Sequence, residues 1–368
     1  MADQVLADIR SRGLVSGDRY LTAEEARSNF RVGKGLINDA LKLLAERQVL
    51  VRKRRAGTFI GPQFSVEADL AAREPVLKIV HVLMPMDYYR SNVIPGSTFV
   101  DQLSQAIPGV SVQIHHIADA STTQYTLELI DRLRLSKGGN KGQSEGLVLL
   151  RSSREAQLAA EKSGLPAVAF GSTYPDVLKL CSIDPDQAQT GRLAAEAALE
   201  RGHQRFALIM RNHWRRGDNL LMDGFSQVLG EAGVGVDRVR VLSTPEDAAV
   251  IEHDVAALLE QDPHPTALVC RSRFHAEAAI RGIRERGLVP GKDVLVISAQ
   301  SGAMTDSSAS LSIVPVLNGP EMVAKVGTLL SEIAQGVDRR GVRKRIAVKV
   351  IASPVEGEQA TEQGRKAG

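Results

Sequence analysis

The stretch that decides the fold of the N-terminal part covers residues 33–60 and reads GKGLINDALKLLAERQVLVRKRRAGTFI. Residues 33–46 carry apolar side chains at helical spacing, which predicts a helix that buries Leu36, Ile37, Ala40, Leu41 and Leu44. Residues 50–60 predict two short strands separated by the basic tip Lys53-Arg54-Arg55-Ala56-Gly57. A helix that can enter the major groove, followed by a cationic hairpin, indicates a DNA-binding module.

Two shorter helices are expected before this stretch. Thr22 is a suitable N-cap for a helix over residues 23–30, and Glu25 stands at the capping-box spacing three residues later. A turn at Gly33 would join this helix to the next one as a helix-turn-helix. An earlier helix is expected to end near Gly13, with one apolar face formed by Val5, Leu6 and Ile9.

The polar side of the third helix and the basic tip supply candidate DNA contacts. Lys34 and Asn38 lie one helical turn apart; a cation can hold phosphate or guanine, and an amide can pair with adenine. Gly35 has no side chain and would allow close approach, and cations in the hairpin would neutralise phosphates. The candidate DNA-binding residues are Thr22, Lys34, Gly35, Asn38, Lys42, Arg52, Lys53, Arg54, Arg55 and Gly57.

The charge of the chain is unevenly distributed. Residues 1–60 contain 12 Lys/Arg and 7 Asp/Glu, whereas the other residues contain 34 and 36. A basic module on a nearly neutral body suits a polyanionic partner for the module alone. A solvated basic face is the alternative explanation of the charge.

Four segments of the module resemble the winged helix of the GntR family of bacterial regulators. They read GDRYLT at 17–22, FRVGK at 30–34, NDAL at 38–41 and RAGTFI at 55–60. The resemblance implies operator binding; a winged helix used for protein contacts is the alternative. The chain departs from the family pattern at Thr22, Gly33, Asn38 and Gln48, where proline, serine, arginine and glycine are common, so the operator sequence does not follow from the family.

After a polar linker at 62–75, apolar strands alternate with helices, which predicts an α/β body with parallel sheets. We therefore expect the fold class α/β, with a small winged helix-turn-helix domain (1–61) before a body at 76–353 and a disordered tail at 354–368. The expected strands are 77–84, 110–116, 146–150, 167–170, 206–210, 238–242, 267–270 and 294–298.

The body resembles the effector domain of the LacI/GalR family, which is similar to periplasmic sugar-binding proteins. The resemblance rests on an ordered set of motifs: SIDPD at 182–186, ERGH at 200–203, DGF at 223–225 and RGLVPGKDV at 286–294. It implies two lobes joined by three strand crossovers, with a small-molecule effector between them. The implied lobes are about 76–175 with 311–337, and about 176–310 with 338–353. A GntR-type head on such a body is similar to hybrid regulators of the arabinose-repressor type.

Side chains just beyond the carboxyl ends of strands are the candidate effector contacts, because open α/β sheets bind ligands there. Arg273 and Gln300 stand where the family often has aspartates that hold sugar hydroxyls, and Leu221 where it often has arginine. Arg273 therefore favours an anionic ligand, such as a sugar acid or a phosphorylated sugar. The alternative is that Arg273 forms a structural salt bridge, which leaves a neutral or aromatic ligand to the aromatic residues. The candidates are Tyr88, Tyr89, Trp214, Arg273 and Gln300.

The sequence lacks the usual motifs of several classes of function. Cys181 and Cys270 are expected to be reduced and buried. The chain has no HxxH, HExxH or CxxC spacing, so neither metal nor cofactor is expected. We find no dinucleotide-binding glycine pattern after a strand, no P-loop and no nucleophile elbow between a strand and a helix. No apolar run reaches about 18 residues, and the N-terminus does not resemble a leader peptide, so we expect a cytoplasmic protein without membrane contact.

These observations favour a ligand-responsive transcriptional repressor without enzymatic activity. Its expected partners are a double-stranded DNA operator, a small-molecule effector and a second copy of the chain, since two heads on a symmetric operator raise affinity. The alternative is an α/β enzyme or a solute-binding protein that uses the same cleft.

Overall fold

The structure is a computed structural model that describes residues 1–53, 57–62, 77–91, 94–118, 122–136, 145–299 and 310–352. The chain divides into two compact units, Met1–Pro75 and Val76–Gly368, which are described separately. Several sequence predictions lie outside the described residues. They concern Arg54, Arg55, Gln300, the linker from residue 63 onward and the tail at 354–368.

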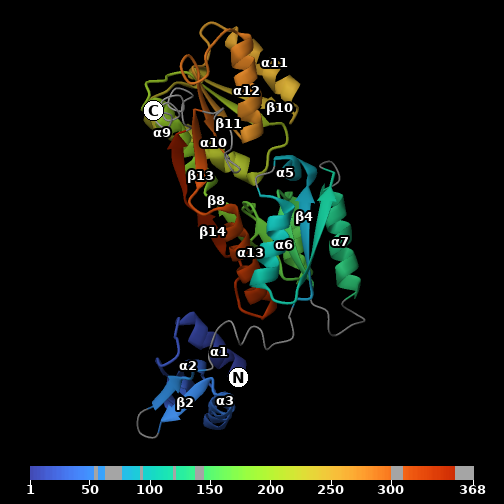
Figure 1. Cartoon of the computed structure of the whole chain (residues 1–368), viewed down its shortest axis with the longest axis vertical. Coiled ribbons are helices and arrows are strands. Elements are labelled where there is room, and N and C mark those ends of the chain that lie inside the picture. The colour runs from blue at the N-terminus through green and yellow to red at the C-terminus, as the bar shows by residue number, and fades with distance from the viewer. Residues whose placement is uncertain are drawn as a thin grey trace, which may run out of the picture. The chain divides into compact units, whose positions relative to one another are not determined.

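The described residues of the N-terminal unit form three helices and a small antiparallel sheet (Figure 1). Thr22 caps the second helix as predicted: its hydroxyl accepts from the Glu25 amide at 3.3 Å, and the Glu25 carboxylate accepts from the Thr22 amide at 2.6 Å. The strands pair in the order β1-β3-β2. The elements are α1 (Ala2–Ser11), β1 (Arg19–Tyr20), α2 (Ala23–Phe30), α3 (Lys34–Glu46), β2 (Leu50–Lys53) and β3 (Gly57–Ile60).

The core of this unit forms where α1, α3 and the sheet meet. The predicted faces of α1 and α3 are confirmed for all residues except Leu36, which is 54% exposed. Ile37, Leu41 and Leu44 follow one side of α3, and Leu36 lies about 100° around the helix from Ile37. The prediction for Leu36 was therefore wrong: it lies outside the buried face of α3.

The larger unit consists of two lobes, each built on a six-stranded sheet. Within the described residues of this unit, the paired strands of both sheets are parallel except for β13 with β15, which confirms the predicted parallel α/β fold class. Lobe 1 has the order β14-β8-β7-β6-β4-β5, and lobe 2 has β10-β9-β11-β12-β13-β15. The strands are β4 (Ile79–Pro85), β5 (Ser111–Ile117), β6 (Glu145–Leu150), β7 (Ala167–Phe170), β8 (Cys181–Pro185), β9 (Phe206–Arg211), β10 (Val239–Thr244), β11 (Ala267–Cys270), β12 (Leu295–Ser298), β13 (Leu311–Pro315), β14 (Arg343–Ile346) and β15 (Val348–Ala352).

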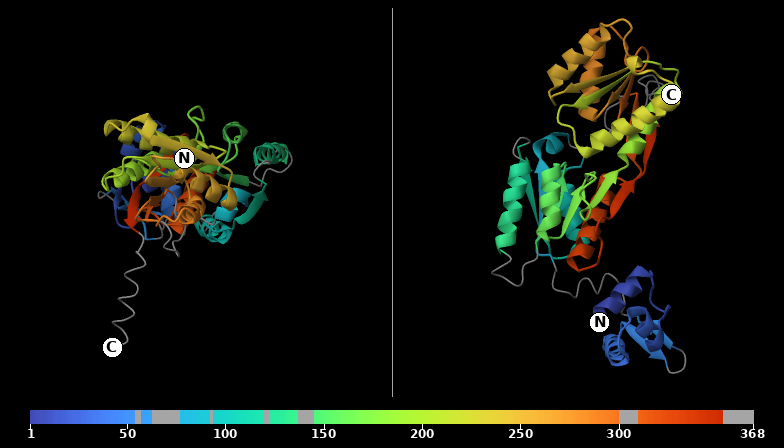
Figure 2. Two further views of the ribbon diagram at one scale, coloured as in Figure 1. Left: turned by 90° about the horizontal axis from the view of Figure 1, so that it is seen from above. Right: turned by 180° about the vertical axis from the view of Figure 1, so that it is seen from behind.

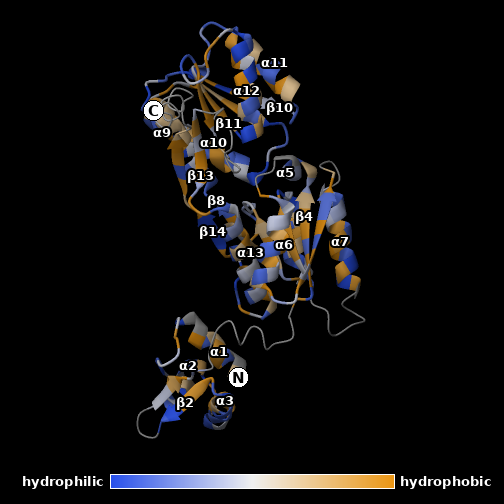
Figure 3. Ribbon diagram, viewed as in Figure 1, coloured by the Kyte–Doolittle hydropathy of each residue, from blue (hydrophilic) through white to orange (hydrophobic). Residues whose placement is uncertain are grey.

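Helices cover both faces of each sheet. In lobe 1, α6 and α13 pack on one face and α7 and α8 on the other; in lobe 2, α9 and α10 pack opposite α11 and α12. Burial on both faces explains the continuous apolar strands, which Figure 3 shows in orange. The helices are α5 (Met86–Ser91), α6 (Gly96–Ala106), α7 (Thr122–Ser136), α8 (Arg154–Ser163), α9 (Gln187–Leu199), α10 (Arg216–Glu231), the 3₁₀ turn η2 (Val236–Arg238), α11 (Ala248–Leu259), α12 (Arg273–Glu285) and α13 (Gly319–Ala334).

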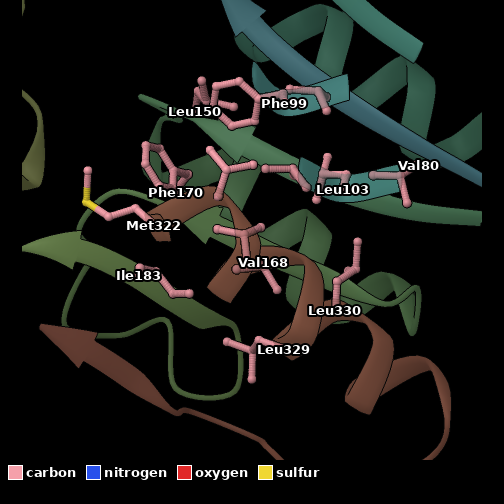
Figure 4. Packing of buried hydrophobic residues seen from close by; sticks show 14 of the residues in the cluster. Val80, Phe99, Leu103, Leu150, Val168, Phe170, Ile183, Met322, Leu329 and Leu330 are labelled. Atoms are coloured by element: carbon pink, nitrogen blue, oxygen red, sulfur yellow. The ribbon is translucent and has the colours of Figure 1, made fainter. Parts of the chain in front are cut away.

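The lobe 1 core shows how distant segments are joined. Phe99 and Leu103 of α6 and Leu330 of α13 pack with strand residues such as Val168 (Figure 4). The Phe99 ring also meets the Phe170 ring edge-on, with centroids 5.7 Å apart. The C-terminal helix α13 is therefore part of the same core as the first strands of the unit.

The chain passes between the lobes after β8, after β13 and after β14 (Figure 2). These crossing points differ from the lobe boundaries implied by the sequence, which placed β8 and β14 in lobe 2 and β13 in lobe 1. The strands lie in the opposite lobes, because β8 and β14 pair in the lobe 1 sheet and β13 pairs with β12. Backbone groups of a buried strand need partners along the whole strand, so each crossing comes at the end of a strand.

Helices α9 and α10 approach each other closely through two glycines. A Cβ atom at Gly224 would lie 2.1 Å from the carbonyl oxygen of Ala188, and one at Gly191 would lie 2.0 Å from that of Leu221. Any side chain at either position would therefore push the two helices apart.

We predict that Gly224→Ala destabilises the protein by about 3 kcal/mol or more, because the added methyl meets a helix backbone. Gly230→Ala, on the same helix, is the control. No heavy atom lies within 4 Å of a Cβ there, and alanine should stabilise the helix by about 0.5–1 kcal/mol. Denaturant unfolding of both variants checks this, and equal effects at the two positions would contradict the close approach.

Candidate functional site

A cavity of about 480 Å³ lies between the two lobes of the larger unit. Its lining comes largely from the carboxyl ends of strands and from the crossovers. Ser172 follows β7 and Asp184 ends β8 in lobe 1, while Ile313 lies in β13 of lobe 2. A volume in the range of roughly 300–1,000 Å³ is typical of small-molecule sites. The cavity is therefore the candidate ligand site, and it has the position expected for open α/β sheets.

Three arginines and two aspartates form a continuous chain of ion pairs beside the cavity. In lobe 1, Arg151 Nη1 lies 2.8 Å from Asp87 Oδ2. In lobe 2, Arg211 Nη2 lies 3.3 Å from Asp218 Oδ1, and Arg271 Nε also donates to this oxygen. The lobes are linked by Arg211 Nη1, which lies 3.8 Å from Asp87 Oδ2. We call these five residues the ion-pair chain.

The strands and helices position each member of the ion-pair chain. Arg151 and Arg271 directly follow β6 and β11, and Arg211 is the last residue of β9. Asp87 lies in α5, directly after β4, and Asp218 lies in the first turn of α10. The Asp218 carboxylate also accepts from the backbone amide of Arg215 at 2.6 Å.

Burial and neighbouring charges shift the pKa values of two members of the ion-pair chain. Burial of Asp218 would raise its pKa, but Arg271 and Arg211 outweigh this effect and hold the pKa at about 2. Burial, reinforced by the positive charge of Arg151, lowers the pKa of Arg211 to about 9, although Asp218 opposes the shift. Arg211 thus remains charged at neutral pH while its charge is only partly compensated.

Some guanidinium donors of the cavity have no acceptor. Among the described residues, no hydrogen-bond partner is present for Arg211 Nε and Nη1, Arg271 Nη1 or Arg215 Nε. All three side chains line the cavity. An unsatisfied buried donor costs about 1–3 kcal/mol, so the cavity can bind a ligand that supplies oxygen acceptors.

Asp184 places a carboxyl group in the cavity wall. It accepts a hydrogen bond from the Ser172 hydroxyl and one of 3.2 Å from Gln187 Nε2. Burial raises the pKa of Asp184 to about 6, in spite of these hydrogen bonds and the charge of Arg271. The group can therefore accept from a ligand when it is ionised and donate when it is protonated.

The remaining wall is mainly apolar. Tyr88 is 4% exposed, and the Arg151 guanidinium lies 5.2 Å from the centre of its ring. Phe170, Ile313 and Met322 continue this wall. Such a surface suits the carbon skeleton of a ligand.

The structure brings only part of the predicted effector set to this cavity. Tyr88 lines it. Tyr89 is 52% exposed and packs edge-on against His116, and Trp214 packs against the lobe 2 core. Neither is among the residues that line the cavity, and nor is Arg273, which forms an ion pair with Glu277 on α12. This pairing corresponds to the salt-bridge alternative for Arg273.

Sequence reasoning missed Arg151, Arg211 and Arg271. A signal was present, because each of these arginines directly follows an apolar strand run: LVLL at 147–150, ALIM at 207–210 and ALVC at 267–270. Ser272 then caps α12, so Arg273 is already the first residue of that helix.

The candidate DNA face of the N-terminal unit is described for most of its residues. Lys34, Gly35 and Lys42 are exposed, and Asn38 is half-buried; Leu36 and Leu43 are also exposed on this helix. A Cβ at Gly35 would meet no heavy atom within 4 Å. Lys42 Nζ lies 3.9 Å from Glu46 Oε1, a surface pair that holds the lysine only weakly.

The hairpin after α3 presents further cations. Arg52 and Lys53 are exposed, and Lys53 Nζ lies 5.1 Å from the centre of the Phe59 ring. Gly57 has a φ of +115°, a conformation that favours glycine at the return of the hairpin. Thr22 serves as the cap of α2, which gives it a structural role in this face.

The described residues contain no group of three or more His, Cys, Asp or Glu that could hold a metal ion. No described helix is long and apolar enough to cross a membrane.

Comparison with known proteins places the larger unit in a known fold class. Residues 195–352 match the family described as periplasmic binding protein-like domain. The dimeric lac repressor bound to its operator and an anti-inducer has a TM-score of 0.60 at 18% identity; the match covers 78% of this chain and 96% of that chain. The two-lobed, periplasmic-binding-protein-like fold predicted from the sequence is therefore confirmed.

Two relatives with curated descriptions are similar in sequence. The HTH-type transcriptional regulator DegA of Bacillus subtilis is 26% identical over 198 residues, which are 54% of this chain and 56% of DegA. An uncharacterised HTH-type transcriptional regulator from Streptomyces limosus is 30% identical over 192 residues, which are 48% of this chain and 51% of that protein. The chain thus spans about half the length of these relatives. These comparisons do not show the GntR resemblance of the head, which stays a prediction.

We predict that Asp184→Asn stabilises the protein at pH 7.5. Because the pKa of Asp184 is raised when the protein folds, the folded state holds a proton that the unfolded state releases between about pH 4 and pH 6. Stability is therefore lost as the pH rises through this window, by up to about 3 kcal/mol. The variant should recover about 1–3 kcal/mol at pH 7.5 and little at pH 4.

Urea unfolding at both pH values checks this prediction. Asp223→Asn, which removes an exposed carboxylate from α10, is the control and should change stability little at either pH. A gain for Asp184→Asn that is equal at pH 4 and pH 7.5 would show that ionisation of this group is not the cause.

Proposed function

We propose that the protein is a ligand-responsive transcriptional repressor, in which the N-terminal unit binds operator DNA and the cavity binds the effector. One observation carries the proposal: a helix-turn-helix with a cationic hairpin is joined in one chain to a two-lobed fold whose cavity holds buried, unsatisfied donors. The names of both sequence relatives, which are HTH-type transcriptional regulators, support it. In this proposal the cavity binds its ligand without converting it, in the cytoplasm, where the operator is accessible.

The N-terminal unit would act as a GntR-type winged helix. α3 would lie in the major groove, where Asn38 reads a base edge and Lys34 and Lys42 hold phosphates. Arg52 and Lys53 would contact the backbone beside the groove, together with Arg54 and Arg55, which follow them in the sequence. Gly35 would allow the helix to approach the bases closely. The exposure of the described members of this set supports the assignment.

The effector would act by changing the distance between the lobes. The chain crosses between them three times, and the Arg211–Asp87 pair links them across the cavity. A ligand that contacts Arg211 and Tyr88 would touch both lobes and favour the closed arrangement. Regulation follows only if the ligand binds the DNA-competent and DNA-incompetent arrangements with different affinity.

A second copy of the chain would complete the regulator. Two heads held in one dimer bind a two-fold symmetric operator with higher affinity, because the second head binds at high effective concentration. The lac repressor, whose fold this unit shares, is described as a dimer on its operator.

We predict different effects for two head variants of the full chain. Asn38→Ala should cost about 1–3 kcal/mol on the preferred duplex only, since a base contact is lost. Arg52→Ala should weaken binding to every duplex and flatten the log–log salt slope by about one, since a phosphate contact is lost. Titrations with a selected and a scrambled duplex between about 50 and 200 mM salt, a fourfold range, measure both effects.

Lys162→Ala is the control for this experiment, because it removes an exposed cation from α8 in the larger unit. It should leave both affinity and salt slope unchanged. An unchanged slope in Arg52→Ala would exclude this residue from the interface, and an equal loss on the scrambled duplex in Asn38→Ala would argue against base reading.

We also predict that the protein sediments at twice the 39.7 kDa mass of one chain at micromolar concentration. On a symmetric duplex, one dimer should bind with both heads, and a duplex with a single half-site should bind more weakly by about 10²–10⁴-fold. Sedimentation as a monomer, both free and on the symmetric duplex, would rule out the dimer.

A further inference from the structure

The chemistry of the cavity indicates which class of ligand it takes. We infer that the cavity binds an organic monocarboxylate, whose carboxylate is held by Arg211 and Arg271 and whose carbon skeleton lies against the apolar wall beside Tyr88 and Phe170. This inference rests on the proposed function, because it names the effector class of the same site. In this inference the anion-binding residue is Arg271 and not Arg273, which the sequence had suggested.

The first argument is the balance of charge. The ion-pair chain contains three guanidinium groups and only two carboxylates, and its side chains are at most 13% exposed. Two further groups lie nearby and offset each other: Glu246 acts on Arg151 and Arg211, and Arg215 lines the cavity. Among these seven groups, one positive charge is left without a counter-charge in a buried site as long as Asp184, whose pKa is raised to about 6 by burial, is protonated. A neutral ligand would not supply that counter-charge.

The second argument is that arginines of the cavity wall have donors without an acceptor. Asp218 pairs with both Arg211 and Arg271, which line the cavity, and each arginine keeps at least one nitrogen without a hydrogen-bond partner. The Nε of Arg215 is a further free donor there. Guanidinium groups prefer the two oxygens of a carboxylate, which can accept from both arginines at once.

The third argument separates a carboxylate from a phosphate. With Asp184 protonated, the surplus beside the cavity is about one positive charge, which matches a monoanion, whereas a phosphate monoester carries about −1.5 to −2 at neutral pH. An ionised Asp184 in the same cavity removes this surplus and repels a dianion more strongly than a monoanion. Ser172 and Gln187, which already donate to Asp184, share the cavity wall with it and with Thr190, so hydroxyl groups of the ligand also find partners there.

Matched pairs of acids and amides test the inference on the full-length wild-type protein. The probes are acetate with acetamide, benzoate with benzamide, and 4-hydroxybenzoate with its amide, at constant ionic strength. We expect acids to raise the melting temperature, and calorimetry to give at least about tenfold tighter binding for the best acid than for its amide. The inference is wrong if no acid exceeds its amide, or if inorganic phosphate stabilises the protein while all three acids fail.

Two matched arginine variants locate the carboxylate. Arg271→Gln should weaken binding of the best acid by about 10- to 100-fold and leave its amide unaffected. Arg273→Gln, on an arginine two residues away that pairs with Glu277 outside the cavity, should bind the acid like the wild type. Equal losses in the two variants would overturn the assignment to Arg271.

Loss of Arg271 leaves Asp218 with fewer partners. A second variant, Arg271→Gln/Asp218→Asn, therefore removes the cation and its partner carboxylate together. We expect this double variant to fold and to bind the acid and its amide with similar affinity. If it keeps the tenfold preference of the wild type, Arg271 does not hold the carboxylate.

These measurements contain no DNA, so they separate the two proposals. Acid binding with no effect on a separate DNA titration would leave the ligand class intact and contradict the repressor function. Ligand-sensitive DNA binding with equal affinity for acid and amide would support the repressor function and contradict the ligand class.

Discussion

The two buried carboxylates Asp87 and Asp218 are the constraint on which the rest of the cavity depends. They hold three arginines between the lobes, and the pair Arg211–Asp87 joins lobe 2 to lobe 1. Burying an ion is costly unless its charge and all its hydrogen bonds are matched. Here the match is incomplete, because free guanidinium donors remain at the cavity. A ligand that supplies the missing acceptors would therefore stabilise the folded protein.

The fold explains how such a cluster forms from residues far apart in the chain. Parallel strands bring their carboxyl ends to one edge of each sheet, and the three crossovers bring the edges of the two sheets to a common cavity. Arg151, Arg211 and Arg271 occupy equivalent places at the ends of three strands. A side chain there leaves the apolar sheet and reaches the cavity, while the next residues already begin a helix.

The head is organised by more local rules. The capping box of Thr22 and Glu25, the helical spacing of Ile37, Leu41 and Leu44, and the pairing of β2 with β3 involve residues close in the sequence. Such features follow from propensity and periodicity, and the structure contains them where the sequence predicts them. Leu36 differs, because the apolar arc of α3 is narrower than its run of apolar residues. Its exposure, together with that of Leu43, adds apolar groups to a helix surface that also carries cations, an amide and glycine.

By itself the sequence determined the order and type of most helices and strands and their parallel pairing, because these depend on hydrophobic period and on short capping and turn signals. The two-lobed class was implied by the resemblance of the body to the LacI/GalR family. The sequence did not determine the lobe to which β8, β13 and β14 belong, since pairing partners are chosen over long distances. Nor did it distinguish Arg271 from Arg273. Two residues separate the end of a strand from the first turn of a helix, and only the tertiary structure decides that one guanidinium lies beside buried Asp218 while the other pairs with Glu277 at the surface.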